Sequence, residues 1–451
     1  MDRLRNSLSL LRRQLWTLPI MCAAGGIVLA FVLLNYGQRI VPAGNIWWLF
    51  SGDAGAARDL LGSLLSGLMT MISLVISVTF VILTLAANQL GPRLISIFMA
   101  DRQIQAVLGL FIGTIIYVIL VLRTLDDTLG AQGVPHLAVT AASVLTILCL
   151  LALLFYVHKV ARSIIADNVV EAVWQEFRKT LRDILASGQG RQDRSAAFDG
   201  PHWQLGVGKV GYVQVIDYDR LVTLAAEAGV RIVVRVRAGH YVLQDGRHLT
   251  VYGETPPSDE LRHRVRAAIT VGPLRTPAQD PEHGIRQLVE IATRALSPGI
   301  NDFFTALAVI DRLGAALECV FQCELQPCVL RDASAEQRVI ADRSDIDGIM
   351  GAAFHPIRQA GANNPAVLIR MAEVIADLSC VARKPAHRLA LEDHIERIAA
   401  TVAIAELIEP DRRDVETALA RARRTLDTAA LPADSETIMN TPAGPAPWHS
   451  R

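Results

Sequence analysis

Residues 60–92 read LLGSLLSGLMTMISLVISVTFVILTLAANQLGP, without a single Asp, Glu, Lys or Arg. A helix that crosses the hydrocarbon core of a membrane needs about 20 consecutive apolar residues. Three other stretches without these charges are also long enough, between Arg13 and Arg39, between Arg102 and Arg123, and between Asp127 and Lys159. The sequence therefore predicts four membrane-spanning helices, near residues 15–36, 62–85, 104–123 and 136–158.

The composition separates this membrane region from the rest of the chain. Hydrophobic residues make up 51% of the 451 positions, which is high for a soluble protein and low for one embedded along its whole length. The formal net charge is zero, so the composition gives no argument for nucleic-acid binding. The first apolar run is too long for the core of a cleavable signal peptide. We expect a multi-pass protein whose partner is the lipid bilayer, with no nucleic-acid partner.

Basic residues near the ends of the predicted helices favour one orientation. One side carries Arg3, Arg5, Arg12, Arg13, Arg93, Arg102, Lys159 and Arg162. The opposite side carries Arg39, Arg58 and the boundary residue Arg123. Because loops rich in Lys and Arg stay on the cytoplasmic side, this asymmetry predicts that both termini are cytoplasmic. The expected location is the cell (inner) membrane.

Small and hydroxyl side chains mark two of the predicted helices. In the second, steps of three, four, three, four and seven residues connect Ser63, Ser66, Thr70, Ser73, Ser77 and Thr84, which therefore share one helix face. One interpretation is close helix packing, because small residues let backbones approach. The other is a hydroxyl-lined pore, which needs several chains around an axis. In the third helix, Gly109 and Gly113 also predict close packing.

The remainder of the chain is predicted to combine helices with a small β-module. After the membrane domain (1–165), apolar residues at helical spacing predict an amphipathic helix and linker over 166–200. Short β-branched runs bounded by turns predict the β-module over 201–275. A helical cytosolic domain follows over 276–430, with candidate helices at 283–296, 302–322, 345–360, 364–383, 386–409 and 411–428. The Pro-, Ala- and Thr-rich residues 431–451 predict a disordered tail.

The predicted fold class is thus an α-helical membrane domain of four transmembrane helices, joined to a cytosolic α+β region. Within the helical part, Ser297-Pro298-Gly299-Ile-Asn301-Asp302 is the most distinctive segment. Pro298 and Gly299 interrupt one helix, and Asn301 or Asp302 can cap the next. Gly299 is the expected position for a positive backbone angle. The segment is interpreted either as a structural elbow or as a polar loop directed at a ligand or another subunit.

Motifs for metal, nucleotide or nucleophile chemistry are missing from the sequence. Cys319, Cys323 and Cys328 form a cluster, but their spacing matches no zinc pattern and no nearby His completes four ligands. There is no P-loop, no G-x-G-x-x-G and no G-x-S-x-G. The predicted spans contain no charged residue of the kind that marks proton relays. We therefore predict no metal, no cofactor and no catalytic residue, and an enzymatic activity is the least favoured of the functions considered below.

Several segments together resemble a family of bacterial predicted membrane proteins, domain of unknown function 2254. The resemblance rests on residues 88–93, 105–111, 158–164, 211–217 and 284–292, and most strongly on Ser297–Asp302. Relatives are expected to have Pro after this Asp, whereas this chain has Phe303. The resemblance covers nearly the whole chain and implies the architecture described above. It brings no activity with it.

Three functions are compatible with these observations. The first is an oligomeric channel or sensor whose cytosolic domain gates or assembles it, as a homo-oligomer. The second is a non-catalytic membrane scaffold that binds a protein partner through the helical domain. The third is a membrane-tethered enzyme that uses the 297–302 loop. The sequence does not identify a small-molecule or ion ligand for any of them.

Overall fold

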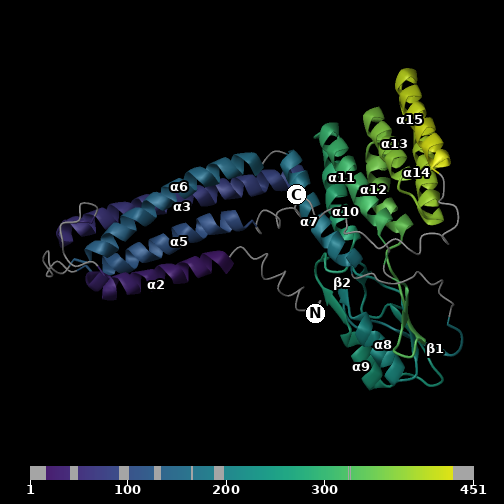
Figure 1. Ribbon diagram of the computed structural model, residues 1–451, viewed down its shortest axis with the longest axis horizontal. Coiled ribbons are helices and arrows are strands. Elements are labelled where there is room, and N and C mark those ends of the chain that lie inside the picture. The colour runs from purple at the N-terminus through teal and green to yellow at the C-terminus, as the bar shows by residue number, and fades with distance from the viewer. Residues whose placement is uncertain are drawn as a thin grey trace, which may run out of the picture. The chain divides into compact units, whose positions relative to one another are not determined.

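The protein is described by a computed structural model in which two compact units follow one another, residues 1–173 and 174–451 (Figure 1). The structure describes residues 17–40, 49–90, 101–125, 134–163, 166–186, 198–323, 325 and 327–429. The predicted disordered tail, the N-terminal arginines and Arg93 lie outside these ranges. Each unit is described by itself.

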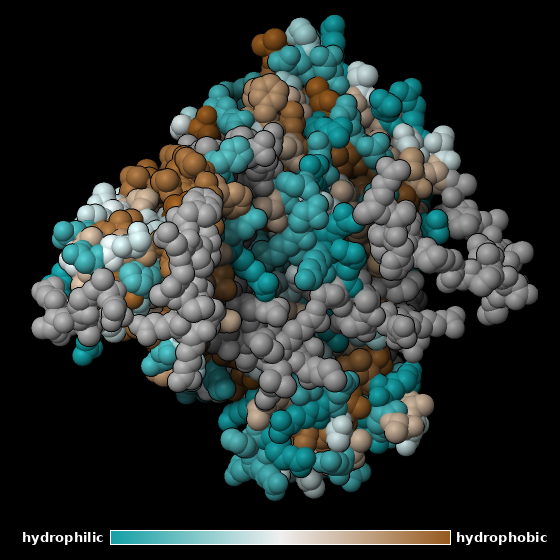
Figure 2. All heavy atoms as spheres, turned by 60° about the vertical axis from the view of Figure 1, so that its left-hand side comes forward, coloured by the Kyte–Doolittle hydropathy of each residue, from teal (hydrophilic) through white to brown (hydrophobic). Residues whose placement is uncertain are grey.

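The first unit is a group of four long apolar helices. These are α2 (Thr17–Ile40), α3 (Ala54–Leu90), α5 (Arg102–Arg123) and α6 (His136–Ser163). All four are long and apolar enough to cross a membrane, which confirms the predicted transmembrane helices. In α5, 67% of the apolar window is buried, because α5 packs against α2, α3 and α6. Hydrophobic residues gather on the outer surface of this unit, as expected for contact with lipid (Figure 2).

Glycines allow α2 and α5 to approach closely. A Cβ atom added at Gly113 would lie 2.7 Å from the carbonyl oxygen of Cys22, and one added at Gly109 would lie 2.8 Å from the Cys22 sulfur. Neither position has room for a side chain. The close packing predicted for Gly109 and Gly113 is therefore present, and its partner is α2.

The second unit contains one mixed sheet, one antiparallel sheet and most of the described helices. A five-stranded sheet has the order β1-β5-β3-β8-β7, formed by His202–Leu205, Leu249–Tyr252, Arg231–Val234, Gln337–Ala341 and Val329–Arg331. Strand β3 pairs with β5 antiparallel and with β8 parallel, placing Ile232 opposite Val251 and Val339. A three-stranded antiparallel sheet has the order β4-β2-β6, formed by Tyr241–Val242, Gly211–Ile216 and Ile269–Gly272. Strands β7 and β8 come from the region expected to be helical, and they complete a sheet that the sequence placed within 201–275.

A hydrophobic core holds the strands to two short helices. Helix α8 (Tyr218–Glu227) begins after Asp217, whose carboxylate accepts a hydrogen bond from the Arg220 amide. Helix α9 (Asp259–Ala267) begins after Ser258 in the same way. Their apolar faces join the buried faces of both sheets, including Leu221, Val265, Ile232, Val213 and Leu249.

Helices α10 to α15 pack together (Figure 1): α10 lies beside α11 and α12, α11 beside α13, and α15 beside α13 and α14. Their bounds are Glu282–Ala295, Phe303–Gln322, Ile346–Ala360, Pro365–Ser379, Pro385–Ile404 and Glu409–Thr428. These bounds lie close to the candidate helices of the sequence, and α13, α14 and α15 each have Pro in the first turn, where its missing N–H costs nothing. The α-helical membrane domain and the following α+β region are thus confirmed.

Helix α7 (Ala166–Ala186) follows α6, and residues 164–165 between them lie outside the described ranges. From Trp174 onward α7 belongs to the second unit and buries Phe177 and Leu181. Phe177 occupies the space in which a Cβ atom at Gly284 of α10 would stand. The glycine therefore allows α7 to lie directly against α10.

Candidate functional site

The hydroxyl residues of α3 lie on the exposed side of the helix. All six side chains predicted to share a face are exposed: Ser63, Ser66, Thr70, Ser73, Ser77 and Thr84. The opposite side of α3 carries Leu61, Leu68 and Val75, which are fully buried against the other helices. The hydroxyl face therefore does not pack against the described residues of its own chain. It is available to lipid, to another copy or to water.

The 297–302 segment forms a tight connection between α10 and α11. Ser297 donates its hydroxyl proton to the Arg294 carbonyl at 2.6 Å. The Asp302 carboxylate caps α11, accepting from the Thr305 amide at 3.1 Å and from the Thr305 hydroxyl at 2.5 Å. Pro298, Gly299 and Asn301 are exposed at the turn. The two inward polar side chains are thus both occupied by the connection itself.

The backbone of this connection differs from the expectation at one residue. The positive backbone angle is at Asn301, with φ 50°, and not at Gly299. A Cβ atom at Gly299 would meet open space. Asn tolerates the left-handed region better than most residues, because its short polar side chain can bond locally. The sequence analysis named Gly299 for this role and Asn301 only as a possible helix cap, whereas Asn301 has the positive angle.

A pair of valine substitutions separates these two positions. Asn301→Val is expected to destabilise the protein by about 1–2 kcal/mol, because a β-branched side chain is strained in the left-handed region. Gly299→Val, the matched control two residues away, is expected to melt close to the parent. Thermal melting of the detergent-solubilised variants measures the difference. Equal losses at the two positions would show that the strain is not located at Asn301.

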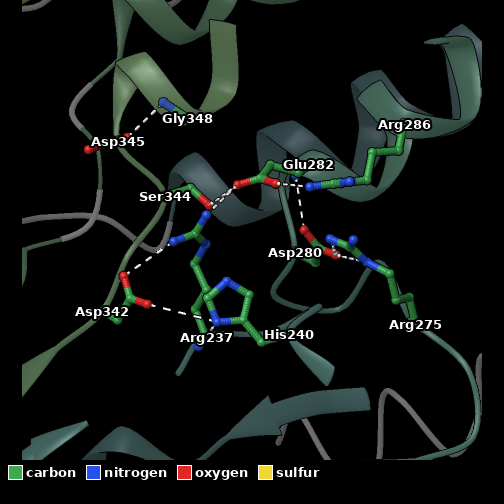
Figure 3. Close-up of polar contacts among 10 residues, drawn as sticks. All are labelled: Arg237, His240, Arg275, Asp280, Glu282, Arg286, Asp342, Ser344, Asp345 and Gly348. Atoms are coloured by element: carbon green, nitrogen blue, oxygen red, sulfur yellow. Dashed lines mark hydrogen bonds and ion pairs between the residues drawn. The ribbon is translucent and has the colours of Figure 1, made fainter. Parts of the chain in front are cut away.

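A network of ion pairs joins three separate segments of the second unit (Figure 3). Arg237, from the β3–β4 connection, lies between Glu282 at 2.9 Å and Asp342 at 3.3 Å. Glu282, in the first turn of α10, also accepts from Arg286 at 3.0 Å and from the Ser344 hydroxyl at 3.0 Å. We call these five residues the Glu282 network. Its members come from positions 237 to 344, so the fold and not the sequence brings them together.

Burial and neighbouring charges act in opposite directions on the Glu282 network. Burial alone would raise the pKa of Glu282, whose side chain is 5% exposed, but hydrogen bonds and charges from Arg286 and Arg237 lower it below its usual value. Burial and the Arg237 charge lower the pKa of His240, against the attraction of Asp342. Glu282 is therefore ionised and His240 neutral near pH 7.

A second buried pair adjoins the network. Arg275 donates from Nε and from a terminal nitrogen to Asp280 Oδ2, at 2.9 and 2.6 Å, while Asp280 Oδ1 accepts from the Glu282 amide at 3.1 Å. Burial raises the pKa of Asp280, and the Arg275 charge opposes this rise. Gly239, at φ 90°, passes so close to the pair that a side chain there would collide with both partners.

The described carboxylates of this region are all engaged, which limits the chemistry that they can perform. Asp280, Glu282 and Asp342 are each paired with an arginine, and Asp345 caps α12 by accepting from the Gly348 amide at 2.8 Å. A general base needs a lone pair that faces a substrate. The network instead holds three segments of the chain together. These segments surround a small cavity of about 40 Å³, which Arg237 and Ser344 help to line.

Comparison with known proteins places this architecture in a family. The family model described as "Predicted membrane protein (DUF2254)" matches residues 12–377. The chain belongs to this family. Two similar proteins, an uncharacterized protein of Mycobacterium bovis and an uncharacterized protein of Mycobacterium tuberculosis strain H37Rv, are each 27% identical over 450 residues, which cover 95% of this chain and 83% of theirs. No solved structure matches.

The DUF2254 match contains the hydroxyl face, the 297–302 connection and the Glu282 network, whereas α14 and α15 lie beyond its end. The sequence did not predict the network, because its charges are ordinary when taken singly and have no fixed spacing. The available signal was weak: two acidic residues flank Pro281 at the start of a helix. Recognising it required the pairing of β3 with β8, which brings positions 237 and 342 together.

The cysteine cluster of the sequence is divided in the structure. Cys319 lies on α11, and burial, with the nearby Glu318 and Cys323, raises its pKa. Cys328 lies instead near Arg343 and Asp342, and burial raises its pKa as well. A thiol must ionise before it acts as a nucleophile or metal ligand, so these shifts disfavour both roles for Cys319 and Cys328.

Proposed function

We propose that this DUF2254 protein assembles from several copies in the membrane and forms a channel whose wall is the hydroxyl face of α3. The supporting observation is the exposure of all six hydroxyl residues on the side of α3 opposite Leu61, Leu68 and Val75. A face that only stabilised the single chain would be buried within it. This one is left for a neighbouring copy or for water.

The length of the face favours a channel over a local crossing of two helices. Ser63 and Thr84 are 21 positions apart, which corresponds to about 32 Å along a helix at 1.5 Å per residue. The hydrocarbon core of a membrane is about 30 Å thick. A crossing between two helices needs small residues over a few turns only. Hydroxyl groups along the entire thickness instead offer hydrogen bonds to water or an ion at every level.

Two of the six hydroxyl groups on this face bond to the backbone of α3 itself. Thr70 donates to the Ser66 carbonyl at 3.0 Å, and Thr84 donates to the Phe80 carbonyl at 2.9 Å. Their protons are therefore satisfied along the helix itself. Each oxygen keeps lone pairs that can accept from water.

We further propose that the protein lies in the inner membrane, with the second unit and both termini in the cytoplasm. The basic residues that flank the spans favour this orientation. In that arrangement the second unit is the part that gates or assembles the channel. Helix α7 supports this role, since it follows the last membrane helix and fixes Phe177 against Gly284 of α10. A displacement of α10 is thereby transmitted to α7.

Cysteine cross-linking tests the assembly. On a background in which the six cysteines are replaced by serine, Ser66→Cys and Ser73→Cys are expected to form disulfide-linked dimers in membranes under oxidising conditions. Val144→Cys, on the exposed side of α6, is the matched control and is expected to remain monomeric. Absence of cross-linking at both α3 positions would refute the assembly around α3.

Ion flux then separates a channel from a scaffold. In proteoliposomes, a positively charged thiol reagent is expected to abolish most of the flux through Ser73→Cys and to leave the Val144→Cys protein unaffected. Cross-linking without reagent-sensitive flux would instead favour the alternative, a non-catalytic scaffold whose copies pack through the same face.

A further inference from the structure

The cavity beside the Glu282 network is lined by Arg343, whose buried Nε has no hydrogen-bond partner among the described residues. It is lined on its polar side by Tyr218, Arg237, Gln279, Arg343 and Ser344. Three of these are already engaged. Arg237 pairs with Glu282 and Asp342, Ser344 donates to Glu282, and the Gln279 amide holds the backbone of Ile216 at 2.9 and 3.1 Å.

Arg343 and Tyr218 are the two that remain. The Arg343 guanidinium lies over the Tyr218 ring, with its central carbon 3.9 Å from the ring centre. Its Nε is buried and has no hydrogen-bond partner among the described residues. Tyr218 is 8% exposed, and its hydroxyl likewise has no partner in the described part of the chain. A buried donor without an acceptor is costly, so the pair is suited to an acceptor from outside.

The local fold holds both donors in place. Tyr218 is the first residue of α8, which Asp217 caps, and Arg343 stands two residues before Asp345, the cap of α12. The Asp342 amide donates to the Val234 carbonyl at 3.0 Å, which fixes the Arg343 segment beside β3. Stacking on an aromatic face leaves the edge of a guanidinium free for a planar partner.

We propose that this cavity binds the carboxylate of a small organic acid with a short aliphatic chain. The carboxylate accepts hydrogen bonds from the Arg343 guanidinium and from the Tyr218 hydroxyl. Hydrogen bonds to a charged acceptor are stronger than those to a neutral one. Leu181, Val320, Leu325 and Ile349 form the apolar wall, which suits the aliphatic chain. The site is independent of the proposed channel and requires no second copy.

Charge and size restrict the ligand further. Among the described residues, Arg237 and Arg286 balance the charges of Glu282 and Asp342, which leaves the positive charge of Arg343 at the cavity and two carboxylates that repel a dianion. A singly charged carboxylate is therefore preferred to phosphate. The cavity has a volume of about 40 Å³. It holds a carboxylate with a few carbons and excludes a nucleotide.

Titration of the full-length, detergent-solubilised protein with sodium butyrate tests the proposal. Saturable binding is expected by calorimetry or by ligand-observed NMR. Arg343→Gln is expected to weaken it by about tenfold to a hundredfold, because a bond to a charged group is lost. Tyr218→Phe keeps the ring and is expected to weaken it by about threefold to tenfold. Arg413→Gln, an exposed arginine paired within α15, is the matched control and is expected to bind as the parent does.

Arg343→Lys keeps the positive charge and removes the planar guanidinium, so it is also expected to weaken binding. Its thermal melt shows whether the second unit is folded. The proposal is overturned if the parent shows no saturable binding of butyrate, or if Arg413→Gln loses as much affinity as Arg343→Gln. It is also overturned if inorganic phosphate binds more tightly than butyrate at equal ionic strength. Because no step of the measurement depends on flux, failure here leaves the channel proposal standing, and the reverse also holds.

Discussion

Glu282→Ala is expected to lower the free energy of unfolding of the second unit by about 3–5 kcal/mol, the range for breaking a buried ion pair by removing one partner. The Glu282 carboxylate is 5% exposed and receives Arg237, Arg286 and Ser344. Its removal leaves Arg237, which is 25% exposed, with Asp342 alone. Most of the loss comes from this poorly compensated charge and not from the contact itself.

Two further variants locate the effect. Glu227→Ala, the matched control, removes an exposed partner of Arg264 and is expected to cost less than about 1 kcal/mol. Arg286→Ala removes a partner of Glu282 that is 50% exposed, and is also expected to have a small effect, because Arg237 remains. Hydrogen exchange of α10 peptides in the full-length protein measures all three. A loss in Glu282→Ala no larger than that in Glu227→Ala would show that the network does not clamp the second unit.

Acid is expected to destabilise the second unit through a buried histidine on α14. His394 is 3% exposed, lies 4.9 Å from the ring of His355, and has no hydrogen-bond partner on Nδ1 among the described residues. Burial, together with His355, lowers its pKa to about 4 from an ordinary value of 6.5. Arg397 and Arg358 act in the same direction, and Asp393 opposes them.

The sign of the effect follows from proton binding. Between pH 6.5 and 4 the unfolded chain holds a proton on this histidine and the folded chain does not. The free energy of unfolding therefore falls as the pH falls through this window. The gap between the two pKa values corresponds to roughly 3 kcal/mol at about 1.4 kcal/mol per pH unit. His355, whose pKa burial also lowers, adds to the loss in the same direction.

His394→Phe removes the titrating group while keeping a ring beside Phe354. Its unfolding free energy is expected to depend less steeply on pH between 6.5 and 4.5, a range above the acid titration of Glu282. His263→Phe, which replaces an exposed histidine of α9, is the control and is expected to keep the slope of the parent. Hydrogen exchange of α12 and α14 peptides measures the unfolding free energy at each pH. If it depends on pH equally steeply in the parent and in His394→Phe, the prediction is wrong.

The sequence predicted most helices because their signals are local. Charge-free runs identified the four spans, and the helices expected from residues 364 and 386 begin within one residue of those positions. The choice between Asn301 and Gly299 was beyond the sequence, since both residues tolerate a positive φ. Tertiary packing decides which of them receives it.

The candidate sites show the same division. The shared face of α3 followed from residue spacing alone, but its exposure depends on which side of α3 meets α5 and α6. Arg237, Glu282 and Asp342 gave no signal, because their proximity follows from a strand pairing between distant segments. Arg343 and Tyr218 were equally hidden, because they lie far apart in the sequence and only the fold stacks the guanidinium on the ring.

The parallel pairing of β3 with β8 also constrains the order in which the chain can fold during synthesis. Strand β3 leaves the ribosome long before β8. Until β8 has been synthesised, the edge of β3 that pairs with it, at Ile232 to Val234, has no neighbouring strand. An unpaired, apolar strand edge is a template for aggregation. A fragment that ends at residue 275 would keep that edge permanently, so the smallest portion of this region suitable for separate expression extends past Ala341.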